Sequence, residues 1–183
     1  FDLVQSAEGR TAAPLLDMYR EYSEPTESTF RMRKVLWIEP AQAGHHDVAF
    51  LSIDEESEDD NPQPPPISLM PDADFEALEV GRWATIIGYP AQSPYNDRQD
   101  QQRIFSGVFN VKRLQPGRVT ALRGDGIVEH DATTLGGNTG STIVDLATGD
   151  AIALHFGGIE GETNSAVAAP VVRQLLTDHV LNA

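Results

Sequence analysis

Apolar and polar positions alternate in short runs along much of this chain, which is the pattern of half-buried β-strands. Residues 30–40, FRMRKVLWIEP, predict one strand, and residues 45–54, HHDVAFLSID, predict a second. Residues 83–90, WATIIGYP, predict a third that ends in a Gly-Tyr-Pro turn. The first half of the chain therefore contributes extended segments rather than long helices.

A second series of apolar runs occupies the rest of the chain, and turn signals separate them about every ten residues. The Pro-Gly pair in LQPGR, residues 114–118, predicts a turn between two of these strands. ATGD, residues 147–150, separates two alternating runs and predicts the clearest hairpin in the sequence. The strands predicted in this part are residues 103–114, 117–122, 126–132, 142–146, 151–156 and 165–170.

The remaining segments are polar or helical. Residues 54–66, DEESEDDNPQPPP, combine acidic side chains with prolines and predict an exposed loop rather than a cation site. Residues 94–103, PYNDRQDQQR, also predict a loop, whereas residues 13–22 have weak helical character. Residues 170–181, PVVRQLLTDHVL, predict a terminal helix with proline in its first turn. The expected fold class is all-β, a sandwich or barrel with a C-terminal helix.

Composition and charge narrow the classes of partner. The net charge of −15 argues against nucleic acid as a partner. No apolar run approaches the roughly 18 residues of a membrane-spanning helix, so we expect no membrane partner. The chain has no cysteine, which excludes disulfides and thiolate metal sites, and no metal or cofactor site stands out. None of these features decides the compartment.

The stretch TLGGNTGSTIVD, residues 134–145, is the most unusual in the chain, because three glycines precede a short apolar run. A phosphate-binding loop requires GxxxxGK[ST] and a following helix, whereas this stretch lacks lysine and leads into a predicted hairpin. A structural turn explains the glycines, but it does not explain the segments DVAFL, GYP and HFGG that accompany them.

Taken in order, DVAFL, GYP, HDATTLGGNTGSTIVD, ALHFGG and the terminal helix resemble the chymotrypsin-fold serine peptidases. Within them, the bacterial glutamyl-endopeptidase-like branch, which lacks disulfides, is the most similar. The resemblance covers roughly residues 30–180 and implies a chymotrypsin-like double β-barrel. It divides the chain into residues 1–80, the remainder of a first barrel truncated at its N-terminus, and residues 81–183, a second barrel with its helix.

The resemblance also implies roles for individual residues. Thr139 falls at the position of the hydroxyl nucleophile, and the N–H groups of Gly137 and Thr139 would form the oxyanion hole. Asp47 falls where the family keeps the buried carboxylate that orients the catalytic histidine, although a strand-start residue beside two histidines is the plainer interpretation. These residues together imply peptide-bond hydrolysis through an acyl-enzyme.

Two departures from the family pattern bear on activity. Threonine replaces serine at position 139, and its β-methyl restricts χ1 and crowds the site. No histidine precedes Asp47 in the family's context, and neither His45 nor His46 is placed to bridge a carboxylate and a hydroxyl. We therefore expect this chain to be inactive or weakened and its N-terminal partner, a segment or chain, to carry the catalytic histidine.

The substrate-binding residues implied by the resemblance are Thr134, His155, Gly157 and Gly158. A histidine and a threonine hydroxyl facing a P1 carboxylate imply a preference for glutamate, despite the negative net charge. The glycines leave room for a peptide or protein substrate to pair as an extra strand. A buried structural histidine is the alternative for His155, and a catalytically dead module that binds peptides or partner domains is the alternative function.

Overall fold

The computed structural model describes residues 14–23, 28–40, 46–159 and 161–182. Its elements are β1 (Leu15–Asp17), β2 (Thr29–Ile38), β3 (Ala49–Ile53), α1 (Asp72–Glu76), β4 (Trp83–Gly88), α2 (Arg98–Phe105), β5 (Arg113–Leu122), β6 (Ile127–His130), β7 (Thr142–Asp145), β8 (Ala151–Ile159), β9 (Thr163–Ala168) and α3 (Ala169–Leu176). A π-helical turn, Thr177–Leu181, continues α3. None of the helices in these ranges has the length and apolar character needed to cross a membrane.

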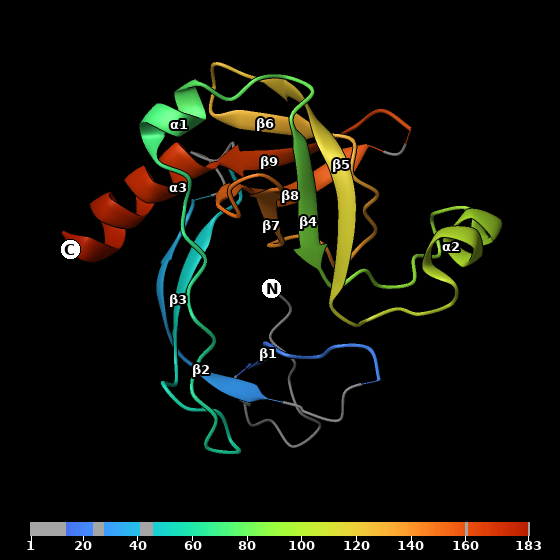
Figure 1. Ribbon diagram of the computed structural model, residues 1–183. Coiled ribbons are helices and arrows are strands. Elements are labelled where there is room, and N and C mark those ends of the chain that lie inside the picture. The colour runs from blue at the N-terminus through green and yellow to red at the C-terminus, as the bar shows by residue number, and fades with distance from the viewer. Residues whose placement is uncertain (1–13, 24–27, 41–45, 160, 183) are drawn as a thin grey trace.

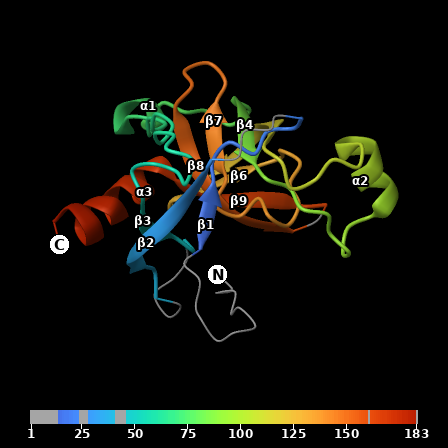
Figure 2. The same ribbon diagram turned by 90° about the horizontal axis from the view of Figure 1, so that it is seen from below.

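Strands β4 to β9 close into an antiparallel barrel in the order β4-β5-β6-β9-β8-β7, and β1-β2-β3 form a separate antiparallel sheet. Figure 1 shows the barrel above this sheet, and in both views α2 and α3 project on opposite sides of the barrel (Figure 1, Figure 2). The predicted hairpin is confirmed, because β7 pairs with β8 around the turn at residues 146–150. The all-β class and the C-terminal helix are confirmed as well.

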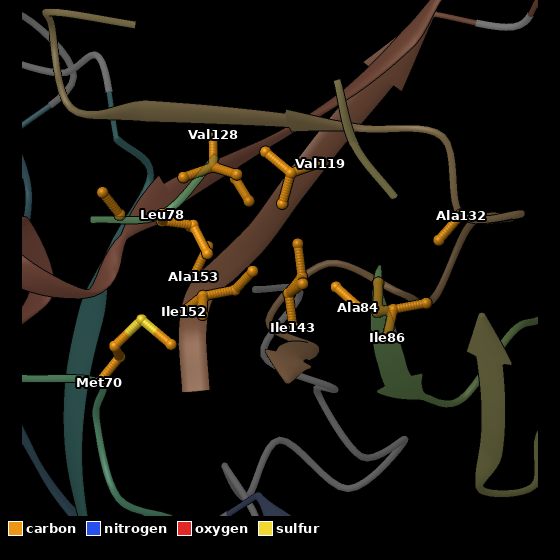
Figure 3. Packing of buried hydrophobic residues seen from close by; sticks show 12 residues of the cluster. Met70, Leu78, Ala84, Ile86, Val119, Val128, Ala132, Ile143, Ile152 and Ala153 are labelled. Carbon is orange, nitrogen blue, oxygen red and sulfur yellow. The ribbon is translucent and has the colours of Figure 1, made fainter. Parts of the chain in front are cut away.

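The core fills the interior of the barrel. Small and branched apolar side chains point toward one another from β4, β5, β6, β7 and β8 (Figure 3). The alternation predicted for these strands places every second side chain inward, and burying those side chains drives barrel closure. The cluster consists of Met70, Leu78, Ala84, Ile86, Val119, Val128, Ala132, Ile143, Ile152, Ala153, Ala166 and Ala168.

The three-stranded sheet is much less covered than the barrel. In β2 only Phe30 is fully buried, and every residue of β3 is partly exposed. Trp37 of β2 stacks on His179 beyond α3, with ring centroids 4.4 Å apart. This contact ties the sheet to the C-terminal end of the chain.

Three sequence-based expectations for secondary structure are wrong, and a fourth correction adds a helix that was not predicted. Residues 15–17 of the segment expected to be weakly helical form β1. Residues 98–105, expected as loop and strand, form α2, because Asp97 caps the helix by accepting hydrogen bonds from the N–H groups of Gln99 and Asp100. The short helix α1 was not anticipated.

The third wrong expectation concerns LQPGR, where β5 continues through Pro116 instead of turning. Pro116 lies opposite Thr85 of β4, whereas β6 pairs with β5 only from Val119 onward. Proline, which lacks an N–H, is tolerated in a strand at a position where no neighbouring strand offers a carbonyl for that N–H to bond. Gly117 is required by close approach, since a Cβ there would lie 2.5 Å from the backbone N and Cα of Ala132.

Gly117→Ala should therefore destabilise the protein by about 1–3 kcal/mol, because the new methyl overlaps the backbone beside Ala132. The matched control is Gly124→Ala, where no atom lies within 4 Å of the added Cβ. Urea unfolding of both variants measures the difference in the free energy of unfolding. Equal stability of the two variants would show that the backbone beside Ala132 shifts to accommodate the methyl group at little cost.

Candidate active site

The loop between β6 and β7, residues 131–141, carries the Gly-rich stretch and is held by backbone hydrogen bonds. The N–H of Asn138 donates to the carbonyl of Leu135 (3.2 Å), and the N–H of Ser141 donates to that of Asn138 (2.9 Å). The N–H of Gly140 donates to the carbonyl of His155 in β8 (2.7 Å). The loop is thus folded on itself and attached to the strand beside it.

Two glycines of this loop have backbone conformations that other residues rarely adopt. Gly137 has φ 91° and Gly140 has φ 86°. A Cβ on Gly137 would also lie 2.6 Å from the carbonyl oxygen of Tyr89. A sharp turn packed against the end of β4 therefore requires glycine at position 137.

The backbone N–H groups of residues 137–141 fall into two sets. Those of Asn138, Gly140 and Ser141 donate to backbone carbonyls. Those of Gly137 and Thr139 have no hydrogen-bond acceptor among the described residues. The turn thus leaves two donors, on alternate residues, available to a further acceptor.

Thr139, which carries one of these two N–H donors, is exposed and lies between Asn138 and Gly140. Its hydroxyl donates to the carbonyl of Phe156 in β8 (3.3 Å). No histidine side chain in the described part of the chain is hydrogen-bonded to it. The hydroxyl is accessible, and its only described partner is a backbone carbonyl.

A cavity of about 620 Å³ opens beside Thr139. Four sequence-predicted substrate-binding residues, Thr134, His155, Gly157 and Gly158, line it together with Thr139. Gly137 belongs to the same loop but is not part of the cavity wall. The structure thus brings most of the predicted site residues to one cavity.

His155 lies in this wall beside a second histidine, His130 of β6, which sequence reasoning left without a role. Nε2 of His130 is 3.2 Å from Nδ1 of His155, and the rings meet edge to face. Only 1% of His130 and 3% of His155 is exposed. Burial lowers the pKa of His155 to about 4, and burial together with the neighbouring His155 lowers the pKa of His130 to about 4. A usable sequence signal was the alternation in β6, which turns His130 inward with Val128.

Thr134 is anchored to Asn164 of β9. The Thr134 hydroxyl donates to Oδ1 of Asn164 (2.6 Å). Nδ2 of Asn164 donates to the carbonyls of Ala132 (2.9 Å) and His130 (3.4 Å), and these two carbonyls fix which end of the amide faces Thr134. Sequence reasoning gave Asn164 no individual role, and only the pairing of β6 with β9 reveals one.

The charged side chains that line the cavity are all acidic: Asp97, Asp100, Asp131 and Glu162. No lysine or arginine belongs to the described wall. Asp100 is paired with Arg103 on the exposed side of α2 (2.9 Å). The mouth of the cavity is therefore electrically negative around a neutral histidine pair.

The predicted orienting carboxylate lies elsewhere. Asp47 is exposed, has φ 51°, precedes β3 and does not line the cavity. His46 contacts Glu39 through Nδ1 (3.4 Å) and the carbonyl of Asp125 through Nε2 (3.3 Å). His45 lies outside the described residues. The role of Asp47 stays a prediction.

The comparisons with known proteins agree with this fold. The chain belongs to the family of trypsin-like peptidase domains, whose sequence model matches residues 4–154. It is 33% identical over 131 residues to a probable serine protease of Lysobacter enzymogenes, in a match that covers 63% of this chain and 33% of that protein. The chain thus spans about a third of the length of this curated relative.

Among solved structures, the chain resembles the inactive form of the M. tuberculosis protease Rv3671c. One structure, at 18% identity and a TM-score of 0.54, is matched over 87% of this chain and 70% of its own. The other is a serine-to-alanine mutant at 20% identity and a TM-score of 0.54, matched over 82% of this chain and 65% of its own. At these identities the likeness concerns the fold, and it confirms the chymotrypsin-like class.

The buried histidine pair should titrate well below the ordinary pKa of 6.5. The imidazole resonances of His130 and His155 should shift near pH 4, as measured by NMR. Because both pKa values are lower in the folded state, the unfolded chain binds more protons between about pH 6.5 and pH 4. The histidine pair therefore contributes its full share to the free energy of unfolding above about pH 6.5, and this share falls as the pH is lowered toward 4. His130→Gln should reduce this pH-dependent loss of stability. Imidazole resonances of His130 and His155 that shift near pH 6.5 would contradict the lowered pKa values.

Proposed function

We propose that this domain is the nucleophile-bearing part of an endopeptidase that hydrolyses peptide bonds through an acyl-enzyme. The observation that carries the proposal is the turn at residues 137–140. It presents an exposed hydroxyl on Thr139 together with two N–H groups, of Gly137 and Thr139, that lack described acceptors. Donors aimed where a carbonyl oxygen gains negative charge supply much of the catalysis in acyl transfer.

In the proposed reaction, Oγ1 of Thr139 attacks the scissile carbonyl carbon while a general base removes the hydroxyl proton. The N–H groups of Gly137 and Thr139 donate to the resulting oxyanion. Collapse of the intermediate breaks the C–N bond, and the proton passes to the leaving amine. Water then attacks the acyl-enzyme by the same route and restores the hydroxyl.

The general base is proposed to be a histidine supplied by an N-terminal segment or a separate chain, oriented by Asp47. Support for such a partner comes from the sheet β1-β2-β3, whose faces are incompletely covered in the described part of the chain. Val35, Leu36 and Ile38 of β2 are each more than a third exposed. Strand β3 pairs only with β2 among the described strands. A partner that covers this sheet would lie next to Asp47.

An extended substrate could add to β8. Gly157 and Gly158 pair with β9 on one side, and on the other side no described strand lies beside them, because β7 pairs with β8 only as far as Leu154. A peptide backbone placed there forms an additional strand, with its P1 side chain directed to the neighbouring cavity. A Cβ on Gly158 would lie 2.3 Å from Oδ1 of Asn164, so glycine there leaves the Asn164 side chain in its place in the cavity wall.

The P1 side chain is proposed to be acidic, chiefly glutamate. Thr134 and His155 line the same cavity, and both carry groups that can engage a carboxylate. Asn164 holds Thr134 in place through the 2.6 Å hydrogen bond. The negative side chains at the cavity mouth oppose such a substrate at long range, so the contacts inside the cavity would have to dominate.

A catalytically dead module that binds peptides is the second candidate. It is favoured by one observation: the Thr139 hydroxyl donates to the carbonyl of Phe156 rather than to a described histidine. The β-methyl of threonine restricts χ1, which hinders rotation of the oxygen toward a substrate. Under this alternative the cavity and the open edge of β8 bind peptide, and no bond is cleaved.

Thr139→Ser should raise the rate of peptide cleavage by on the order of 100-fold, because removal of the methyl lets the oxygen reach the line of attack. The assay measures kcat/KM of the complete protein, including the proposed histidine-bearing partner, on peptides with glutamate or arginine at P1. Thr120→Ser, at an exposed position of β5, is the control and should change nothing. Absence of any gain with all partners present would favour the binding module.

His155→Gln should reduce the selectivity for glutamate over glutamine at P1 by roughly 10-fold or more, because the amide of glutamine cannot take up a proton to balance a P1 carboxylate, whereas an imidazole can. The measurement is the ratio of kcat/KM for two peptides that differ only at P1, in the Thr139→Ser background. A ratio unchanged by His155→Gln would remove the acidic preference from this cavity and leave the peptidase assignment intact.

A further inference from the structure

Two side-chain amides inside the barrel have no hydrogen-bond partner among the described residues. They belong to Asn138, in the Gly-rich loop, and to Gln115 of β5, and in each amide both the oxygen and the nitrogen are buried and unpaired. Asn138 is 0% exposed and Gln115 is 6% exposed. Buried polar side chains in folded proteins are bonded to protein or to ordered water, because an unpaired buried amide destabilises the fold. These four atoms therefore require partners.

The side chain of Gln115 points into the barrel. Gln115 lies opposite Ile86 of β4, and Ile86 lies opposite Ile143 of β7. Residues directly opposite one another in a sheet project from the same face, and both isoleucines belong to the apolar core. The amide of Gln115 is thus on the inner face of the wall, where its neighbours across the sheet are apolar.

Asn138 reaches the same part of the interior from the loop. Gly88 follows Ile86 by two residues on β4 and so presents the same inner face. A Cβ on Gly88 would lie 2.5 Å from Oδ1 of Asn138 and would overlap the hydroxyl of Ser141. The Asn138 amide therefore occupies the place of a side chain at position 88, diagonally across the sheet from Gln115. Diagonal positions lie roughly 7–8 Å apart, within reach of a long side chain.

The two amides face a common region but do not bond each other, since no hydrogen bond within the described ranges joins them. Each amide offers an acceptor oxygen and two N–H donors. Water both donates and accepts, and a buried water makes about three hydrogen bonds to polar groups that are otherwise unpaired. A polar contact too long for a direct hydrogen bond can be completed by such a water.

The anchoring of Asn138 affects the two N–H groups beside it, those of Gly137 and Thr139. Among residues 136–140, Asn138 alone is buried. The N–H of Thr139 shares a peptide group with the carbonyl of Asn138, and in a planar trans peptide the two point in opposite directions. That carbonyl accepts from the N–H of Ser141 (2.9 Å). The direction of the Thr139 N–H therefore follows the orientation of Asn138.

We propose that buried water bridges the amides of Asn138 and Gln115, and that these two residues position the N–H groups of Gly137 and Thr139. The water site belongs to the barrel and goes beyond the proposed function. The positioning role rests on the proposed function, because the same two N–H groups are its oxyanion-hole donors. The bridge fastens the turn to β5, a strand that contributes no residue to the described cavity wall.

NMR of the complete protein, 15N-labelled at asparagine and glutamine, tests for the water. Magnetisation transfer from water to the side-chain NH2 groups is measured by nuclear and rotating-frame Overhauser experiments, between which the cross peaks of a bound water change sign. We expect such cross peaks at Asn138 and Gln115. Gln101 is the internal control and should show none, because it is similarly buried and its Nε2 donates to the carbonyls of Ser93 (2.8 Å) and Asn96 (2.9 Å).

A hydroxyl that exchanges protons with solvent could relay the same signal. The Ser141 hydroxyl is close enough to do so, since it and the Asn138 amide would both contact a Cβ on Gly88. Ser141→Ala removes this hydroxyl, and the cross peak at Asn138 should persist in that variant. Its loss would assign the signal to the hydroxyl and overturn the bound water.

Gln115→Met tests the bridge and the positioning role together. Methionine fills a similar volume but offers neither the N–H donors nor the carbonyl oxygen of glutamine, so the water loses its partners on β5. We expect loss of the water cross peak at Asn138 and a shift of the backbone N–H resonances of Gly137 and Thr139. The N–H resonance of Val167 in β9 should stay in place. A purely structural role of Gln115 would lower the stability of the barrel without shifting the two loop resonances.

Gln99→Met, at an exposed position of α2, is the matched control and should change none of these signals. Absence of water cross peaks at both amides of the unmodified protein would overturn the bridge, and this measurement needs no variant to fold. A cross peak that persists at Asn138 in Gln115→Met would also contradict the bridge, and unmoved loop resonances would contradict the positioning role. None of these readouts involves peptide cleavage, so failure of the peptidase proposal is distinguishable from failure of the water bridge.

Discussion

Two backbone hydrogen bonds join the Gly-rich loop, residues 131–141, to β8, and the geometry of the cavity wall depends on them. The N–H of Gly140 donates to the carbonyl of His155, and the N–H of His155 donates to the carbonyl of Ser141. One residue therefore presents its backbone to the loop and its side chain to the cavity. Any displacement of β8 would move the loop and the cavity wall together, so the Thr139 hydroxyl and the histidine pair form one rigid unit.

The barrel supplies that rigidity. Its closure through β4 and β7 packs a continuous apolar core directly beneath the loop, and Gly137 fits against the backbone of Tyr89 where β4 ends. Close packing of this kind leaves few alternative positions for a side chain or a turn. The unsatisfied donors of Gly137 and Thr139 are thus held in place rather than free to find partners of their own.

The interior of the cavity differs in charge from its mouth. Inside, the histidines are neutral, because burial lowers their pKa, while carboxylates surround the entrance. A ligand is therefore selected by two separate effects: long-range repulsion or attraction at the mouth and short-range hydrogen bonding within. The net charge of the protein therefore does not by itself decide which side chain the interior of the cavity accepts.

Much of this protein could be predicted from local sequence. Alternation located the main strands of the barrel and ATGD marked the β7–β8 hairpin, because turn chemistry and inward-facing side chains are short-range properties. GGNTG and HFGG indicated the loop and the cavity wall only through the resemblance to the chymotrypsin-fold peptidases. The sequence alone did not determine that β5 runs through Pro116, since this depends on where β6 begins to pair, or that residues 98–105 form a helix. It also did not reveal the contacts of His130 with His155 and of Thr134 with Asn164. Those pairs lie 25 and 30 residues apart, and only barrel closure, which sets the order β6-β9-β8, brings their polar atoms within hydrogen-bonding distance.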